Sequence, residues 1–246
     1  MKDEIVYGLN PVTEALRGKR RVFELFVAAS GSDRRLEKLL TLAAEKGVPV
    51  RQRDKRDLAR LCGTEHHQGV ALRVEPFVYA QLSDILEKCG TPGTEGLLLV
   101  LDGVQDPHNL GALIRSAACA GAQGVIIPRD RAVGVTATVE KASAGAIETI
   151  PVAEVTNVAH TLEELKRAGF WIYGADGASP LSIFDQDLTG AVALVIGSEG
   201  EGIRPLVRKK CDHLVSIPLR GGVNSLNASV AGGILLFEAV RQRSNS

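Results

Sequence analysis

The sequence predicts an α/β protein with a largely parallel sheet, divided into two domains. Short apolar runs typical of strands alternate with amphipathic segments typical of helices throughout the chain, as in parallel sheets that are covered by helices. A turn-rich stretch from Thr91 to Gly96 interrupts this alternation and favours a boundary. We therefore predict a first domain over residues 1–76, a linker over residues 77–95 and a second domain over residues 96–246.

The first domain is expected to contain a complete set of helices and strands of its own. Asn10 and Pro11 predict a capped helix that ends at Gly18, and Asp54 predicts the cap of a later helix. The remaining elements that we predict in this domain are strands at residues 23–28, 48–51 and 69–74, and helices at residues 33–46 and 55–61.

The second domain is expected to carry the larger sheet. Apolar runs predict six strands, and the helical segments lie between them. Gly232 and Gly233 lie inside the last predicted helix, residues 230–240, where each glycine costs on the order of 1 kcal/mol relative to alanine. Their presence predicts that another backbone packs closely there. The six predicted strands are residues 97–101, 125–127, 150–152, 171–174, 192–196 and 214–217.

Charge and cysteine content narrow the class of protein. Lysine plus arginine equals aspartate plus glutamate at 29 each, but residues 1–76 hold 15 basic and 11 acidic side chains and the rest hold 14 and 18. This split is a modest indication of a nucleic-acid partner.

The four isolated cysteines indicate neither disulfides nor a metal site. Without a leader or an apolar stretch of about 20 residues, we expect a cytoplasmic protein that does not bind membranes.

The first candidate functional segment follows the predicted strand at residues 97–101. Its polar residues run from Asp102 to Asn109, and ligands bind at this carboxyl edge in open α/β sheets. Asn109 is expected to cap a helix on which Arg115 lies six residues further on. Taken alone, the segment fits equally well a simple helix cap followed by a surface arginine.

The second segment is the glycine-rich loop from Gly197 to Gly202, which follows another predicted strand. Its two glutamates, Glu199 and Glu201, would repel a pyrophosphate but would tolerate a positive sulfonium or ligand hydroxyl groups. The loop therefore favours S-adenosylmethionine over a dinucleotide. A glycine-rich turn with solvated acidic side chains is the alternative interpretation.

The third segment, residues 217–229, combines several small polar residues before an apolar helix. Asn227 or Ser225 can accept hydrogen bonds from the first backbone N–H groups of that helix, which leaves other polar groups for a substrate. Capping combined with tight packing is the alternative explanation.

In this order, the three segments resemble the three motifs of the SpoU/TrmH family of RNA ribose methyltransferases, within the SPOUT superfamily. The matching residues are Asn109-x-Gly-x-x-x-Arg115, Gly197-Ser-Glu199-Gly and Asn-Ser225-Leu-Asn227-Ala-Ser. The resemblance implies an α/β-knot domain, in which a trefoil knot binds S-adenosylmethionine beside a homodimer interface. It implies cofactor contacts from Ala175, Asp176, Gly197, Ser198, Gly200, Ile217, Leu219 and Leu226, and no metal.

The resemblance also implies that five residues serve the reaction, methylation of a ribose 2′-hydroxyl in RNA. Because arginine keeps its charge in proteins, we expect Arg115 to hold a neighbouring phosphate and to stabilise the emerging alkoxide rather than to act as a base. His108 is interpreted as a turn residue. The residues expected to position the ribose and Arg115 are Asn109, Glu199, Ser225 and Asn227.

The front part of the chain, at Tyr7 to Val12 and His67 to Ala71, resembles the small α/β substrate-binding domain, similar to ribosomal protein L30e, of bacterial 23S rRNA guanosine methyltransferases. This resemblance implies 23S rRNA as the partner. Alternatives are a tRNA ribose methyltransferase and an RNA-binding protein without catalysis; a dinucleotide-dependent oxidoreductase lacks its glycine fingerprint. Candidate phosphate contacts are Arg17, Lys19, Arg20, Arg21, Arg51, Arg53, Lys55, Arg56 and Arg60.

Overall fold

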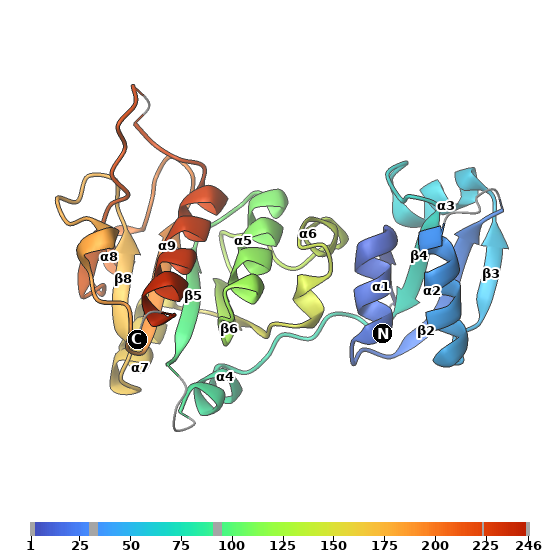
Figure 1. Cartoon of the computed structure of the whole chain (residues 1–246), viewed down its shortest axis with the longest axis horizontal. Helices are drawn as coiled ribbons and strands as arrows, with labels where there is room; N and C mark the ends of the chain where they lie inside the picture. Colours follow the sequence, from blue (N-terminus) through green and yellow to red (C-terminus); the bar gives the residue numbers. More distant parts are fainter. Residues whose placement is uncertain (1–2, 30–33, 91–94, 223, 245–246) are drawn as a thin grey trace. The chain divides into compact units, whose positions relative to one another are not determined.

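The computed structural model describes residues 3–29, 34–90, 95–222 and 224–244 (Figure 1). The chain forms two compact units, Met1–Val78 with Val135–Thr149, and Tyr79–Gly134 with Ile150–Ser246. The first unit is therefore assembled from two separate stretches of chain. Residues 91–94 of the predicted turn lie outside the described residues, and the domain boundaries at residues 76 and 96 stay a prediction.

The first unit holds a small mixed sheet with the strand order β1-β4-β2-β3. β4 runs antiparallel to both of its neighbours, and β2 and β3 are parallel. Asp54 caps α3 as predicted, by accepting a hydrogen bond from the Asp57 N–H. The elements of this unit are β1 (Glu4–Tyr7), α1 (Leu9–Arg17), β2 (Val22–Ala28), α2 (Arg34–Glu45), β3 (Val50–Arg53), α3 (Lys55–Cys62), β4 (Val70–Val74), α6 (Ala137–Ala142) and the 3₁₀ helix η1 (Ala146–Glu148).

The start of α1 corrects a prediction, because Asn10 does not cap this helix. The capping position is Gly8, whose φ of 96° favours glycine, and Asn10 already lies in the first turn. The first N–H of the helix, on Leu9, donates instead to Oε1 of Gln68 at 2.9 Å. A side chain far along the sequence thus supplies the acceptor that the local sequence was expected to provide.

Arg20 corrects a second prediction, because its guanidinium is buried in an ion cluster rather than exposed to RNA. Its side chain is 12% exposed and pairs with Glu4 at 3.1 Å, with Glu140 at 2.6 Å and with Glu148. Glu140 lies on α6 and Glu148 on η1, both in the stretch Val135–Thr149. The cluster therefore joins the second stretch of the first unit to the first.

The second unit holds a six-stranded parallel sheet with the order β10-β8-β9-β5-β6-β7. β7 and β10 differ from the predicted residues 150–152 and 214–217, and the other four strands lie where they were predicted. The elements are α4 (Leu82–Cys89), β5 (Leu97–Asp102), α5 (Pro107–Cys119), β6 (Gly124–Pro128), β7 (Val152–Val155), α7 (Val158–Arg167), β8 (Trp171–Ala175), η2 (Ile183–Asp185), β9 (Val192–Gly197), α8 (Pro205–Arg208), β10 (His213–Val215) and α9 (Ala228–Arg243).

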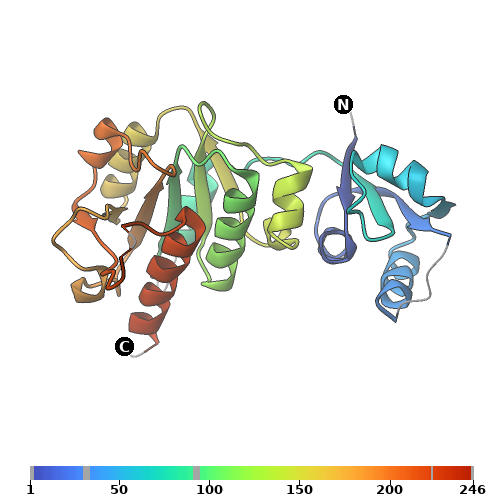
Figure 2. The same cartoon turned by 90° about the horizontal axis from the view of Figure 1, so that it is seen from above.

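Helices cover both faces of this sheet, with α5 and α9 together on one face and α7 on the other (Figure 2). Ile85 and Cys89 of α4 pack with α7 residues against strand residues such as Leu98. A Cβ at Gly232 of α9 would overlap the Leu113 side chain of α5, so a side chain and not the predicted backbone packs closely there, whereas Gly233 has only ordinary contacts. No helix in the described part of the chain is long and apolar enough to cross a bilayer.

The strand order places a crevice at the carboxyl ends of β5 and β9. The chain leaves β5 toward β6 on one side and leaves β9 toward β10 on the other, although the two strands are neighbours. Such a reversal of direction separates the loops that follow the two strands, which is where ligands bind in open α/β sheets. Asp102 and Gly197 lie opposite each other at this point.

Candidate active site

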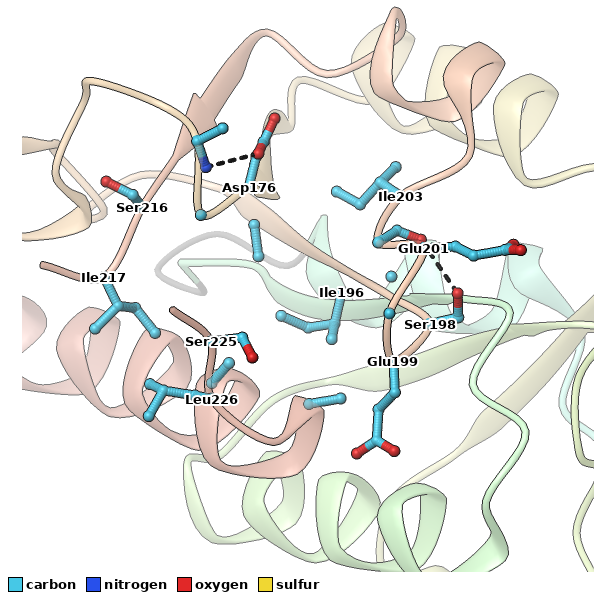
Figure 3. A pocket seen from close by; sticks show the side chains of 18 of the residues that line it. Asp176, Ile196, Ser198, Glu199, Glu201, Ile203, Ser216, Ile217, Ser225 and Leu226 are labelled. Atoms are coloured by element: carbon cyan, nitrogen blue, oxygen red, sulfur yellow. Dashed lines mark hydrogen bonds between the residues drawn. The ribbon is translucent and has the colours of Figure 1, made fainter. Parts of the chain in front are cut away.

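A cavity of about 950 Å³ opens beside this crevice, at the carboxyl ends of β8, β9 and β10 and the start of α9 (Figure 3). Its volume is in the range of small-molecule sites in proteins. Every residue that was predicted to contact a cofactor lines it, namely Ala175, Asp176, Gly197, Ser198, Gly200, Ile217, Leu219 and Leu226.

The glycine-rich loop forms one wall of the cavity and folds tightly back on itself. The Ser198 N–H donates to the Gly202 carbonyl at 3.1 Å, and the Gly202 N–H donates to the Ser198 carbonyl at 3.0 Å. Gly197 has no room for a side chain, because a Cβ there would overlap the backbone of Gly202. From this loop, Glu199 and Glu201 point in different directions (Figure 3). The turn thus separates the two carboxylates.

A buried ion pair that the sequence analysis missed holds the far end of this loop. Asp102 is fully buried at the end of β5, and it accepts hydrogen bonds from the Arg204 N–H at 2.8 Å and from Arg204 Nε at 2.7 Å. The Arg204 Nη2 group also pairs with Asp102. The one sequence signal for this contact is the acidic residue that ends an apolar strand.

Glu199 is fixed by two amide side chains from different elements. Asn109 Nδ2 donates to Glu199 Oε1 at 2.8 Å, and Asn227 Nδ2 donates to the same oxygen at 2.6 Å. Asn227 Nδ2 also lies 3.0 Å from Asn109 Oδ1. One residue from each of the three sequence motifs therefore meets in a single hydrogen-bonded cluster.

Asn109 reaches this cluster because it does not cap its helix, which corrects the sequence prediction. Asp106 caps α5 by accepting from the His108 N–H, and Pro107 occupies the first turn. Asn109 is then buried inside the helix, with its side chain free to bond across to Glu199. Asn227 does cap its helix, α9, as one of the two predicted candidates.

The other two predicted catalytic residues, Ser225 and Arg115, are not among the three residues of this cluster. Ser225 lines the cavity and is exposed. Arg115 lies on α5, outside the cavity lining, and its exposed side chain makes no hydrogen bond or ion pair with the described residues. His108 is exposed next to the cap of α5. Of the predicted catalytic residues, Glu199, Ser225 and Asn227 therefore line the cavity, whereas Asn109 and Arg115 do not.

Asp176 and Arg208 form an ion pair at the opposite wall, with Arg208 Nε 2.9 Å from Asp176 Oδ2. The hydrogen bond from the Ala178 N–H, together with Arg208, lowers the pKa of Asp176 below its ordinary value. Sequence reasoning missed Arg208, which carries no motif signal.

Among residues 3–29, 34–90, 95–222 and 224–244, no three side chains of His, Cys, Asp or Glu gather as metal ligands do.

Two protein families match nearly the whole chain. Residues 5–80 match a domain described as RNA 2′-O ribose methyltransferase substrate binding. Residues 96–237, which contain all three motifs and the cavity, match the SpoU rRNA Methylase family.

Individual relatives match over nearly their full length. A Ralstonia nicotianae protein named 23S rRNA (guanosine-2′-O-)-methyltransferase RlmB is 47% identical, covering 99% of this chain and 97% of its own. The Bacillus subtilis protein YacO, named a putative TrmH family tRNA/rRNA methyltransferase, is 42% identical, covering 98% and 96%. The solved structure of the SpoU methyltransferase AviRb from Streptomyces viridochromogenes with AdoMet is 28% identical, with a TM-score of 0.82 over 99% of this chain and 92% of that one. The chain belongs to the SpoU rRNA methylase family.

Proposed function

We propose that the protein uses S-adenosylmethionine to methylate a ribose 2′-hydroxyl of RNA, at a guanosine of 23S rRNA. The observation that carries the proposal is the Glu199 carboxylate, held by Asn109 and Asn227 at the rim of a cavity of suitable size. The names of the relatives support the substrate, since the Ralstonia nicotianae protein is named for 23S rRNA guanosine.

The cavity fits this cofactor on chemical grounds. Glu199 and Glu201 disfavour a phosphate-bearing ligand and tolerate a cationic one, and the tight turn at Gly197 brings backbone groups to the cavity surface. When bound, S-adenosylmethionine supplies a methyl group activated by its sulfonium. The residues proposed to hold it are Ala175, Asp176, Gly197, Ser198, Gly200, Ile217, Leu219 and Leu226.

The remaining catalytic work is to orient the ribose and to manage its proton. Glu199 Oε1 already accepts from both amides, and no described residue donates to Oε2, so this oxygen is available to orient a ribose hydroxyl. Ser225 lines the same cavity and is proposed to contact the substrate. Arg115, which keeps its charge, is proposed to hold the adjoining phosphate and to stabilise the 2′ oxygen, while an oxygen of that phosphate accepts the hydroxyl proton.

A homodimer is part of this proposal. Val230 and Phe237 lie seven residues apart on one side of α9 and are 50% and 48% exposed. α9 packs against α5, the helix that carries Arg115 outside its own cavity. A second copy docked on this face would bury the apolar side chains and would bring Arg115 into an interface.

Light scattering tests the dimer. We expect the wild-type mass to be twice that of one chain, and Phe237→Asp to shift the population toward single chains, because a charge would enter an apolar interface. A wild-type protein that remains a single chain at micromolar concentration contradicts the dimer.

Methylation is tested with unmodified 23S rRNA, methyl-labelled S-adenosylmethionine and alkaline digestion, because a 2′-O-methyl group protects the adjacent phosphodiester from alkali. We expect label in an alkali-resistant dinucleotide that contains guanosine. Arg115→Ala and Glu199→Gln should lower turnover by about 10²–10³-fold, while Arg167→Ala, an exposed arginine of α7, keeps it. Label in tRNA instead would favour the tRNA enzyme, and no label in either RNA would contradict catalysis.

A further inference from the structure

The loop that follows β6 lies at the carboxyl edge of the sheet, the edge that also carries the proposed active site. β6 is the neighbour of β5, and the loop carries three exposed charged residues in a row, Arg129, Asp130 and Arg131. None of them belongs to the three motifs or lines the cavity. RNA that presents a ribose to Glu199 has further nucleotides on both sides, and these must lie over neighbouring loops of this edge.

A backbone hydrogen bond joins this loop to the segment between β5 and α5. The Val133 N–H donates to the Val104 carbonyl at 3.0 Å. A Cβ on Gly103 would lie 3.7 Å from the Arg131 carbonyl oxygen and 3.9 Å from Ser198 Cβ, so both residues lie close to Gly103. The Arg131 backbone and Ser198, the residue that precedes Glu199, therefore both lie next to Gly103.

The conformation of Arg131 is unusual for an arginine. Its φ of 60° lies in the left-handed region, which glycine adopts at far lower cost than residues with a side chain. The exposed guanidinium makes no hydrogen bond or ion pair with any described residue. In contrast, Nε of the neighbouring Arg129 lies 3.9 Å from Asp130 Oδ2. An arginine at a backbone position that favours glycine, with no partner among the described residues, indicates a partner outside the protein.

We propose that Arg131 binds a phosphodiester of the RNA strand next to the nucleotide that is methylated. The inference rests on the proposed function and extends the substrate site from the cavity to the β6 loop. A planar guanidinium can donate two parallel hydrogen bonds to phosphate oxygens, which suits a group that holds a strand in register. The contact is to the backbone, so it adds affinity without reading the base.

The test uses Arg131→Gly and Arg131→Gln in the full-length protein, with Arg167→Gln as a matched control. Arg167 is an exposed arginine at the end of α7, near the start of β8 and hence at the opposite edge of the sheet. The probe is an unmodified 23S rRNA transcript. Its binding is measured without cofactor at several KCl concentrations, and S-adenosylmethionine binding and resistance to urea are measured alongside.

We expect both Arg131 variants to bind the transcript about three- to tenfold more weakly, and the slope of log affinity against log salt to become shallower by about 0.7 to 0.9. Cofactor affinity should be unchanged. Arg131→Gly should resist urea at least as well as the wild type, because glycine relieves the left-handed strain. Arg167→Gln should match the wild type in every measurement.

The outcomes separate this inference from the proposed function. If the wild type methylates RNA and Arg131→Gly binds the transcript with unchanged affinity and salt slope, the phosphate contact is wrong and the proposed function stands. If the wild type neither binds nor methylates RNA, both are wrong. An equal loss of binding in Arg167→Gln would reduce the Arg131 effect to a general effect of charge and would overturn the specific contact.

Discussion

Asp102 is a single buried carboxylate on which the shape of the glycine-rich loop depends. It receives both the backbone N–H and the guanidinium of Arg204, two residues past the turn that ends at Gly202. A fully buried charge is tolerated where a partner and hydrogen bonds compensate for its lost hydration. The contact thus links the end of β5 to the loop that carries Glu199.

Asp102→Asn is expected to destabilise the protein by about 1–3 kcal/mol, because it weakens the charged hydrogen bonds to Arg204, whose side chain is 38% exposed. Cofactor affinity should fall as well, since the loop loses its anchor. Urea unfolding and calorimetric titration with S-adenosylmethionine measure the two effects. Asp185→Asn, at an exposed aspartate of η2, is the control. Full cofactor affinity in Asp102→Asn would show that the loop holds its shape without the ion pair.

The motif residues were predictable from the sequence, and their contacts were not. Three ordered motifs pointed to Asn109, Glu199 and Asn227, but no local pattern tells that their side chains meet. The cap of α5 was misplaced because both Asp106 and Asn109 are good capping residues, and Pro107 in the first turn decides for Asp106. The Asp102–Arg204 pair spans 102 positions, beyond the reach of any local rule.

At the scale of elements, continuous apolar strands were predictable, and the short elements β1 and α6 were not predicted individually. β5 and β9 are buried along their whole length, and their continuous apolar runs identified them. β1 has four residues and α6 has six, too few for a periodic pattern to be recognised. Both are stabilised by contacts with other parts of the first unit, such as the pairing of β1 with β4.

The packing of α9 on α5 predicts opposite changes in stability when alanine replaces two adjacent glycines of α9. Gly232→Ala should destabilise the protein by about 1–3 kcal/mol, because the new Cβ overlaps Leu113. Gly233→Ala should stabilise it by about 0.5–1 kcal/mol through helix propensity, since the new Cβ would lie at an ordinary 3.8 Å from Ser116 Oγ. Urea unfolding of the two variants serves as a matched comparison. Equal effects would contradict the packing of α9 on α5.

At the scale of the whole molecule, the ion cluster of the first unit gives stability a dependence on pH. The pKa of Glu140 is raised to about 7, chiefly by burial; Arg20 opposes this rise, and Glu4 and Glu148 add to it. The folded state therefore holds a proton that the unfolded state releases near pH 4.3. The stabilisation is complete below that pH and is lost as the pH rises through about 7, by no more than about 1.4 kcal/mol per pH unit.

Urea unfolding between pH 5 and pH 8 tests this dependence. Circular dichroism follows both units, and the fluorescence of Trp171, the chain's one tryptophan, follows the second. We expect the free energy of unfolding of the first unit to fall as the pH rises. In Glu140→Gln it should fall less steeply, because the amide does not ionise. Glu65→Gln, at an exposed glutamate of the same unit, should keep the wild-type profile. A parallel profile in Glu140→Gln would assign the dependence to other groups.

Because the first unit is built from two separate stretches of chain, its ion cluster can form only late in synthesis on the ribosome. A ribosome must add residues 79–134 before it reaches the stretch Val135–Thr149, which takes on the order of several seconds at about 5–20 residues per second. During that interval Arg20 has Glu4 as a partner, while Glu140 and Glu148 have not yet been made. The nascent first unit therefore cannot close its charge cluster until β5 and β6 of the second unit have been translated.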